Sequence, residues 1–85
     1  ASDVYKRQLI GFALETENEI ENAKNKLTNK NLDGIVLNSL KDNDTGFSVN
    51  TNKITFIHND LRTESFPLQT KLACAHRIFE QILSI

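Results

Sequence analysis

Two short apolar runs, separated by an amphipathic segment, constrain the fold of this chain most strongly. The runs are residues 9–14 and 34–38, and neither alternates polar with apolar residues. Such runs are typical of strands buried on both faces of a parallel sheet. Between them, apolar residues recur at three- and four-residue spacings, which predicts a helix over about residues 17–30. The apolar stripe of that helix consists of Ile20, Ala23 and Leu27. The sequence therefore predicts a parallel strand-helix-strand unit with a right-handed crossover.

The ends of this helix also carry local signals. Thr16 and Glu19 have the spacing of a capping box, in which the Thr hydroxyl accepts a hydrogen bond from the third helical amide. Asn31 and Gly34 supply a C-terminal stop. We therefore expect the helix to begin directly after Thr16.

The second half of the chain predicts antiparallel strands and a final helix. Residues 47–49 and 53–58 read as a hairpin with a turn at residues 50–52, followed by a loop over residues 59–65. Phe66-Pro67 is expected to open the last helix. Its predicted core stripe is Leu68, Leu72, Ala75, Ile78, Phe79 and Ile82. The fold class is thus α/β: a fragment of a three-layer Rossmann-like sheet, with the parallel unit followed by the antiparallel hairpin and the C-terminal helix.

Composition limits the classes of function. The 85 residues carry a formal net charge of -1, and the ten basic residues are spread along the chain. This distribution argues against general nucleic-acid binding. The single cysteine, Cys74, excludes an internal disulfide and is expected to be a small residue at a helix edge. No apolar run reaches the roughly 18 residues of a membrane span, and no signal peptide is apparent. We expect a cytoplasmic protein, whose small core favours a partner or a further segment.

The N-terminal residues differ in character from the rest. The sequence contains no methionine, so we expect a fragment of a longer chain. Residues 1–8 resemble the translated end of a transposase adapter used in sequencing libraries, and the alternative is a native polar turn. Functional reasoning therefore starts at residue 9, and residues 9–85 form the candidate domain.

Ligands of open α/β sheets bind beyond the carboxyl ends of parallel strands, here residues 14–16 and 38–40. Neither segment is a glycine-rich phosphate loop. Lys26 and Lys30 are neighbours on the predicted helix and border its apolar stripe. Two like charges at this spacing favour an anion between them, although lysines near a helix end are also stabilised by the helix dipole.

Other candidate residues have simpler alternatives. Phe12 either fills the core or stacks on a base, and the neighbouring Gly11 removes bulk beside it. Glu15 is a metal ligand, a base, or only a favourable partner for the helix dipole. His58 and His76 are expected to be structural or solvated, and spacing supports no catalytic triad.

Several ordered blocks carry a family resemblance. The blocks are residues 11–16, 23–27, 30–38, 46–47 and 52–54. In this order and spacing they resemble the C-terminal end of bacterial phosphopantothenate-cysteine ligase. The resemblance implies an enzyme of coenzyme A biosynthesis that uses CTP and Mg²⁺ to join 4'-phosphopantothenate to cysteine through an acyl-cytidylate. It further implies that Phe12 touches the cytidine and that Lys26 and Lys30 contact CTP. Other determinants of the family precede residue 9, so the fragment alone is expected to be inactive.

The resemblance also implies partners. Many such ligases are fused to a decarboxylase that binds FMN, outside this chain, and the ligase is a homodimer. We expect the hairpin of residues 47–58 to contact the second subunit through its antiparallel edge, with Phe56 and Ile57 at the contact. Two alternatives stay open: a non-catalytic α/β interaction module, and the same reaction driven by ATP.

Overall fold

The chain forms a mixed sheet between two helices. The computed structural model describes residues 9–39 and 51–84. Its elements, in chain order, are β1 (Ile10–Glu15), α1 (Glu19–Asn29), β2 (Gly34–Ser39), β3 (Thr51–Asn52), β4 (Ile54–His58), β5 (Thr63–Ser65), β6 (Gln69–Thr70) and α2 (Lys71–Leu83). None of the helices in the described ranges is long and apolar enough to cross a membrane.

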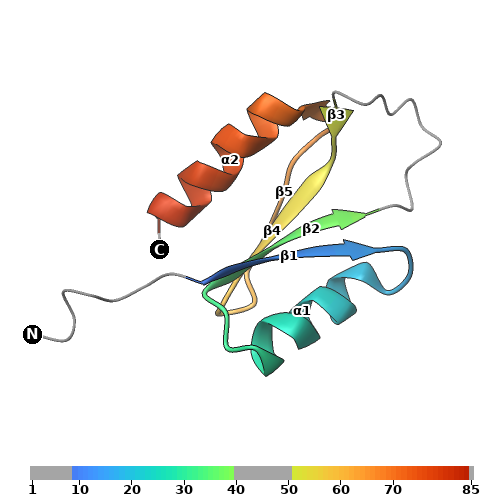
Figure 1. The fold of residues 1–85 in the computed structure, drawn as a ribbon, viewed down its shortest axis with the longest axis vertical. Helices are drawn as coiled ribbons and strands as arrows, with labels where there is room; N and C mark the ends of the chain where they lie inside the picture. The colour runs from blue at the N-terminus through green and yellow to red at the C-terminus, as the bar shows by residue number, and fades with distance from the viewer. Residues whose placement is uncertain (1–8, 40–50, 85) are drawn as a thin grey trace, which may run out of the picture.

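The main sheet has the strand order β1-β2-β4-β5. β1 and β2 pair in parallel, whereas β4 is antiparallel to both β2 and β5. β3 and β6 form a separate two-stranded ribbon. Figure 1 shows α1 on one face of the sheet and α2 on the other, which gives three layers. The predicted fold class and the parallel strand-helix-strand unit are confirmed.

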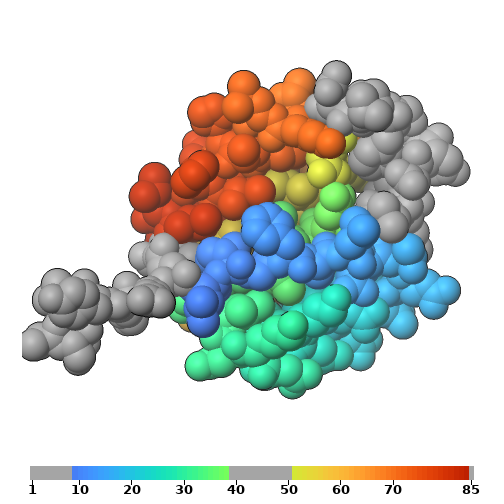
Figure 2. Space-filling model, in the orientation of Figure 1, coloured from blue at the N-terminus to red at the C-terminus, as the bar shows by residue number. Residues whose placement is uncertain are grey.

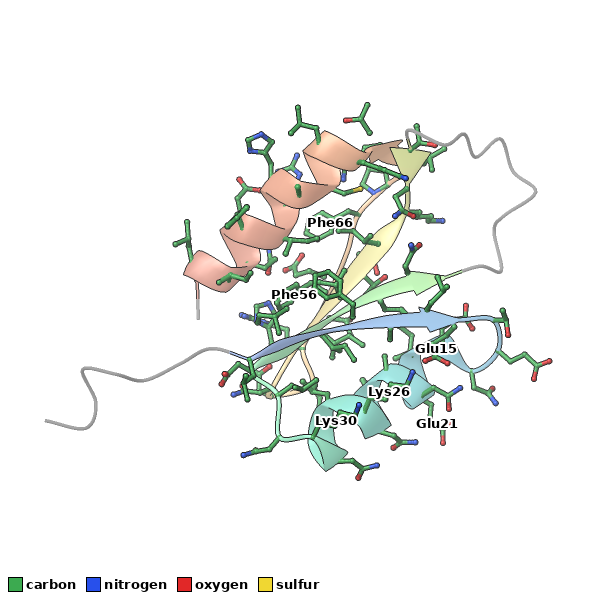
Figure 3. The ribbon with its side chains drawn as sticks, in the orientation of Figure 1. Glu15, Glu21, Lys26, Lys30, Phe56 and Phe66 are labelled. Atoms are coloured by element: carbon green, nitrogen blue, oxygen red, sulfur yellow. The ribbon has the colours of Figure 1, made fainter. Side chains whose placement is uncertain are left out.

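Each face of the sheet has its own core. Facing α1, the buried cluster consists of Ala13, Ala23, Leu27, Ile35, Leu37 and Ile57. Facing α2, it consists of Val36, Ile54, Phe56 and Cys74, with Ile10, Phe66, Ile78 and Ile82 packed against it. Phe56 and Phe66 lie between the sheet and α2 in Figure 3. The residues of β2 and β4 thus alternate between two buried faces, which explains why their sequences do not alternate in polarity. The expected burial of β1 on both faces is wrong for Phe12 and Leu14, which are exposed on the α2 side.

The start of α1 differs from the expectation. The N-cap is Asn18, not Thr16, and its side chain makes no capping hydrogen bond. Asn18 has a φ of 47°, in the left-handed region that asparagine tolerates better than most residues. Its carbonyl accepts the amide of Asn22 at 2.8 Å and so begins the helical ladder. The predicted capping box is therefore wrong, because a left-handed turn after β1 delays the helix by two residues.

The predicted hairpin is also wrong where the structure describes it. Residues 51–52 form β3, which pairs with β6, and do not form a turn. β4 instead makes its hairpin with β5, inside the segment expected to be a loop. The predicted strand at residues 47–49 lies outside the described residues.

The last helix begins four residues later than Pro67 predicts. Thr70 is its N-cap, and the Thr70 hydroxyl accepts the amide of Ala73 at 3.1 Å. The buried stripe is also rotated, because Cys74 is buried whereas Leu72 and Phe79 are exposed. Contact with the sheet, which the helical period alone does not specify, decides which apolar residues face inward.

The proposed subunit contact through Phe56 and Ile57 is contradicted. β4 lies between β2 and β5, so it is an interior strand and not an edge. Both side chains are fully buried, on opposite faces of the sheet. Neither side chain can reach a second subunit without unfolding the sheet.

Candidate functional site

The carboxyl end of β1 holds a lysine in a fixed position. Lys26 of α1 forms an ion pair with Glu15, with 2.7 Å between Nζ and Oε2. The other carboxylate oxygen of Glu15 accepts a longer hydrogen bond, 3.3 Å, from the side-chain amide of Asn22. The Glu15 side chain is only 12% exposed, while that of Lys26 is 47% exposed. Figure 3 shows Lys26 on the β1 side of α1, near Glu15. One ammonium is thus held at the strand end while it remains open to solvent.

Lys30 lies just beyond the last turn of α1. Its backbone amide donates to the Lys26 carbonyl at 3.0 Å and closes that turn. The side chain is exposed, and within residues 9–39 and 51–84 its ammonium has no partner. Figure 3 places Lys30 on the same helix as Lys26 but farther from the carboxyl end of β1. Lys30 is the C-cap of α1, four residues after Lys26, and of these two lysines only Lys26 is paired with a residue at the end of β1.

Phe12 belongs to the other face of the sheet. β1 alternates, so Gly11 and Ala13 face α1 whereas Ile10 and Phe12 face α2. The Phe12 ring is 71% exposed, so it does not fill the core. It borders a cavity of about 250 Å³ between the sheet and α2. The cavity is lined by Phe12, Val36, Asn38, Asn52, Ile54, Lys71, Cys74, Ala75 and Ile78. In Figure 2, green and yellow atoms of the sheet are visible between the blue β1 and the orange α2.

Gly11 has a different role from the one expected. A Cβ atom there would lie 2.6 Å from Cδ1 of Leu32, on the α1 face. The missing side chain therefore makes room for Leu32 and not for a ligand on Phe12. The direction of each strand residue decides this point, because neighbours along a strand face opposite sides.

Of the three polar residues in the cavity with Phe12, sequence reasoning found Asn38 and missed Asn52 and Lys71. Asn38 lies in the segment where ligands are expected, at the carboxyl ends of the strands. Lys71 was missed because Phe66-Pro67 predicts an earlier start of the last helix. Lys71 is then expected within the helix, whereas it is the first residue of α2. Asn52 was missed because it was placed in a turn and not in β3. A pairing between distant segments positions Asn52, and no local signal reports that pairing.

Cys74 lines the same cavity. It is buried on the side of α2 that faces the sheet and does not lie at the edge of that helix, as was expected. Its Sγ is within 3.5 Å of the Asn52 carbonyl oxygen, to which it donates. Burial raises the pKa of the Cys74 thiol, because the thiolate would lose hydration. The thiol is therefore a weak nucleophile at neutral pH, and its role is to pack α2 on the sheet.

The two histidines lie away from both lysines and the cavity. His58 is buried, and its Nε2 lies 2.8 Å from Oε1 of Gln81 in α2. The His58 ring also packs against Phe56, with centroids 4.8 Å apart. His76 is exposed. His58 thus joins α2 to the sheet, in line with the expected structural role.

The described residues do not provide a dedicated metal site. No group of three or more His, Cys, Asp or Glu side chains in residues 9–39 and 51–84 is placed to hold a metal ion. Glu15 lies at the carboxyl end of β1, where a ligand is expected, and its two carboxylate oxygens are bound by Lys26 and by the side-chain amide of Asn22. In nucleotide sites Mg²⁺ is usually bound by one or two carboxylates together with substrate phosphates and water, and among the described residues Glu15 is the carboxylate at this end of β1 that is held beside Lys26.

The predicted contacts lie on two sides of one strand. Phe12 is on the α2 face of β1, while Lys26 lies on α1 and Lys30 is the C-cap of α1, on the other face. A ligand that lies over the carboxyl end of β1, where Glu15 holds Lys26, reaches both faces, and a ligand confined to one face does not. The candidate site is therefore the carboxyl end of β1.

The chain resembles known proteins over nearly its whole length. The family described as "DNA/pantothenate metabolism flavoprotein C-terminal domain" matches residues 1–85. A prokaryotic "Cysteine/Cysteine sulfinic acid decarboxylase" is 52% identical over 77 residues, which are 91% of this chain and 21% of that protein. The Bacillus subtilis (strain 168) "Coenzyme A biosynthesis bifunctional protein CoaBC" is 38% identical over 77 residues, 91% of this chain and 19% of that protein.

A solved structure extends the likeness to the fold. The crystal structure of the C-terminal domain of a CoaBC protein matches with a TM-score of 0.73 and 37% identity, over 96% of this chain and 39% of that one. The chain thus spans about a fifth of the curated relatives and less than half of the solved domain.

Proposed function

This chain belongs to the DNA/pantothenate metabolism flavoprotein C-terminal domain family, and we propose that it is the nucleotide-binding end of an enzyme of coenzyme A biosynthesis. The enzyme joins 4'-phosphopantothenate to cysteine and uses CTP. One observation carries the proposal: β1 presents an exposed aromatic ring, Phe12, and three residues later Glu15, which holds the Lys26 ammonium. The carboxyl end of such a strand is where open α/β sheets bind nucleotides.

The reaction needs activation because a carboxylate is a poor electrophile. In the proposed first step, a carboxylate oxygen of phosphopantothenate bonds to the α-phosphorus of CTP. The bond from that phosphorus to the bridging oxygen breaks, and pyrophosphate leaves with the electron pair. In the second step, the cysteine amine attacks the acyl carbon of the acyl-cytidylate, loses a proton and displaces CMP.

The roles of the chain's own residues follow from their chemistry. Phe12 offers a flat surface for the base, and such stacking contributes about 1–3 kcal/mol per base in nucleic-acid complexes. Lys26 and Lys30 bind phosphate oxygens, whose charge a lysine stabilises most where water is partly excluded. Glu15 holds Lys26 in place before the nucleotide arrives. Mg²⁺ that accompanies the nucleotide is part of the proposal, but the described residues form no ligand set for it and no step depends on it.

The remainder of the enzyme is expected outside this chain. The CoaBC relatives are named bifunctional, which supports a fused second activity, and we assign FMN to that decarboxylase part. A homodimer also remains part of the proposal. No contact surface is assigned to it, because β4 is an interior strand.

A trapped intermediate tests the proposal. The full-length protein that contains this chain should be incubated with 4'-phosphopantothenate and CTP but without cysteine. We expect mass spectrometry to detect the acyl-cytidylate together with an equal amount of pyrophosphate, because the displacing amine is missing. A parallel incubation with ATP separates the alternative nucleotide, since only the preferred one gives an acyl-nucleotide.

Two results would contradict the proposal. Failure to form any acyl-nucleotide, with the substrates intact, favours a non-catalytic interaction module. Nucleotide-independent loss of CO₂ from cysteine by the same protein, with no acyl-nucleotide, favours the activity named for the 52% identical relative.

A further inference from the structure

Lys71 lies on the same side of the sheet as Phe12. It is the first residue of α2 and lines the cavity that Phe12 borders. Within residues 9–39 and 51–84, the Lys71 ammonium has no hydrogen-bond or ion-pair partner. The lysines expected to bind phosphate lie on the opposite face: Lys26 is on α1, and Lys30 is the C-cap of that helix. Of the described cations, Lys71 is therefore the one that shares a cavity with the aromatic ring.

The lining of the cavity contains both apolar and polar side chains. Val36, Ile54 and Ile78 supply apolar surface between the sheet and α2. Asn38, Asn52 and Lys71 supply the polar groups. The Thr70 hydroxyl accepts the Ala73 amide, and the full positive charge at this end of α2 is the Lys71 ammonium, which adds to the partial positive charge of the helix N-terminus. This combination suits a flat heterocycle attached to an anionic group.

The size of the cavity limits how much of a nucleotide enters it. At about 250 Å³ it lies below the range of about 300–1,000 Å³ usual for pockets that enclose a drug-sized ligand. It can receive a base, but the triphosphate must extend outside. Asn38 of the cavity pairs with Leu14, next to Glu15 at the carboxyl end of β1. The first phosphate is then the one nearest to the cavity, and the later phosphates extend over the carboxyl end of β1 towards Lys26.

We propose that Lys71 binds the α-phosphate of the nucleotide whose base stacks on Phe12, while Lys26 and Lys30 bind the β- and γ-phosphates. This assignment rests on the proposed function. The α-phosphorus is the atom that the substrate carboxylate attacks, and its non-bridging oxygens gain negative charge as the pyrophosphate bond breaks. Lys71 stabilises that charge. It transfers no proton, so the atoms and charges of the step stay as given above.

Three cytidine ligands distinguish the phosphate contacts. Affinities for cytidine, CMP and CTP should be measured by calorimetry on the full-length protein. We expect Lys71→Gln to weaken CMP and CTP by about tenfold each and to leave cytidine unchanged, because one charged hydrogen bond to the α-phosphate is lost. Lys26→Gln should weaken CTP and spare CMP. Lys71→Arg should retain CMP affinity, since it keeps the charge, and Lys24→Gln is the matched control for loss of a lysine charge.

The outcomes separate this inference from the proposed function. If the unaltered protein binds none of the three ligands, the proposed function fails before any variant is compared. If the unaltered protein binds CTP and CMP, and Lys71→Gln leaves both affinities unchanged, the assignment of Lys71 is overturned. An equal loss of affinity for cytidine would also overturn it, because it would show that Lys71 shapes the cavity and does not contact phosphate.

Discussion

Replacing Phe56 by alanine lowers the free energy of unfolding of the 85-residue chain by about 3–5 kcal/mol. Phe56 is completely buried and lies at the centre of the cluster between the sheet and α2. Its ring also contacts His58, which is hydrogen-bonded to Gln81 of α2. The variant therefore leaves a cavity and loosens the attachment of the helix. Urea denaturation followed by circular dichroism measures the change.

Phe79→Ala is the matched control for this change. Phe79 lies on α2 but is 64% exposed, so its removal is expected to change stability by no more than about 0.5 kcal/mol. Phe56→Leu should fall between the two variants, because it refills part of the cavity. Equal stability of Phe56→Ala and Phe79→Ala would contradict the described core.

Replacing both Lys26 and Lys30 by glutamine lowers kcat/KM for CTP by about a hundredfold or more in the full-length enzyme. Each lost charged hydrogen bond to phosphate costs about 1.5–3 kcal/mol, and 1.4 kcal/mol is about a tenfold change. Steady-state release of pyrophosphate at varied CTP measures the effect. Lys24→Gln, on the same helix, is expected to leave kcat/KM unchanged.

The Lys26 variant needs a separate stability measurement. Lys26 is the partner of a Glu15 carboxylate that is only 12% exposed, so its loss leaves that carboxylate with a weaker set of partners. Thermal unfolding of the variant shows how much of the kinetic loss is due to misfolding. A folded double variant with normal kcat/KM for CTP would show that the two lysines are surface charges.

The first half of the fold could be predicted because its signals are local. The apolar runs at residues 9–14 and 34–38, and the helical spacing between them, specified two parallel strands and a crossover helix. The core of this unit also followed, since Ala23 and Leu27 are both buried. Only the exact start of α1 was misplaced, because a left-handed Asn18 replaced the expected capping box.

The second half depends on contacts between distant segments. Thr51–Asn52 becomes a strand because it pairs with Gln69–Thr70, and neither segment alone has a strand pattern. β5 consists of Thr63–Ser65, and all of its residues are exposed. No alternation of polar and apolar residues therefore indicates a strand there. Such short strands are stabilised by their partners and not by their own propensity.

The candidate site was predictable by residue type but not by direction. Phe12, Lys26 and Lys30 stand out through family resemblance, and the carboxyl ends of the strands were expected from the topology. That Phe12 faces α2, while Lys26 lies on α1 and Lys30 caps that helix, required the structure. Lys71 required it as well, because its place in the cavity depends on where α2 begins and on how that helix crosses the sheet.

One assay decides whether the full-length protein is the proposed CTP-dependent ligase. It measures the formation of phosphopantothenoylcysteine with CTP and, in parallel, with ATP. The amide product, the nucleoside monophosphate and pyrophosphate should be quantified together from 4'-phosphopantothenate and cysteine. We expect one CMP and one pyrophosphate for each amide formed, with CTP strongly preferred over ATP. Amide formation without nucleotide cleavage, or no amide formation with either nucleotide, would contradict the proposed function.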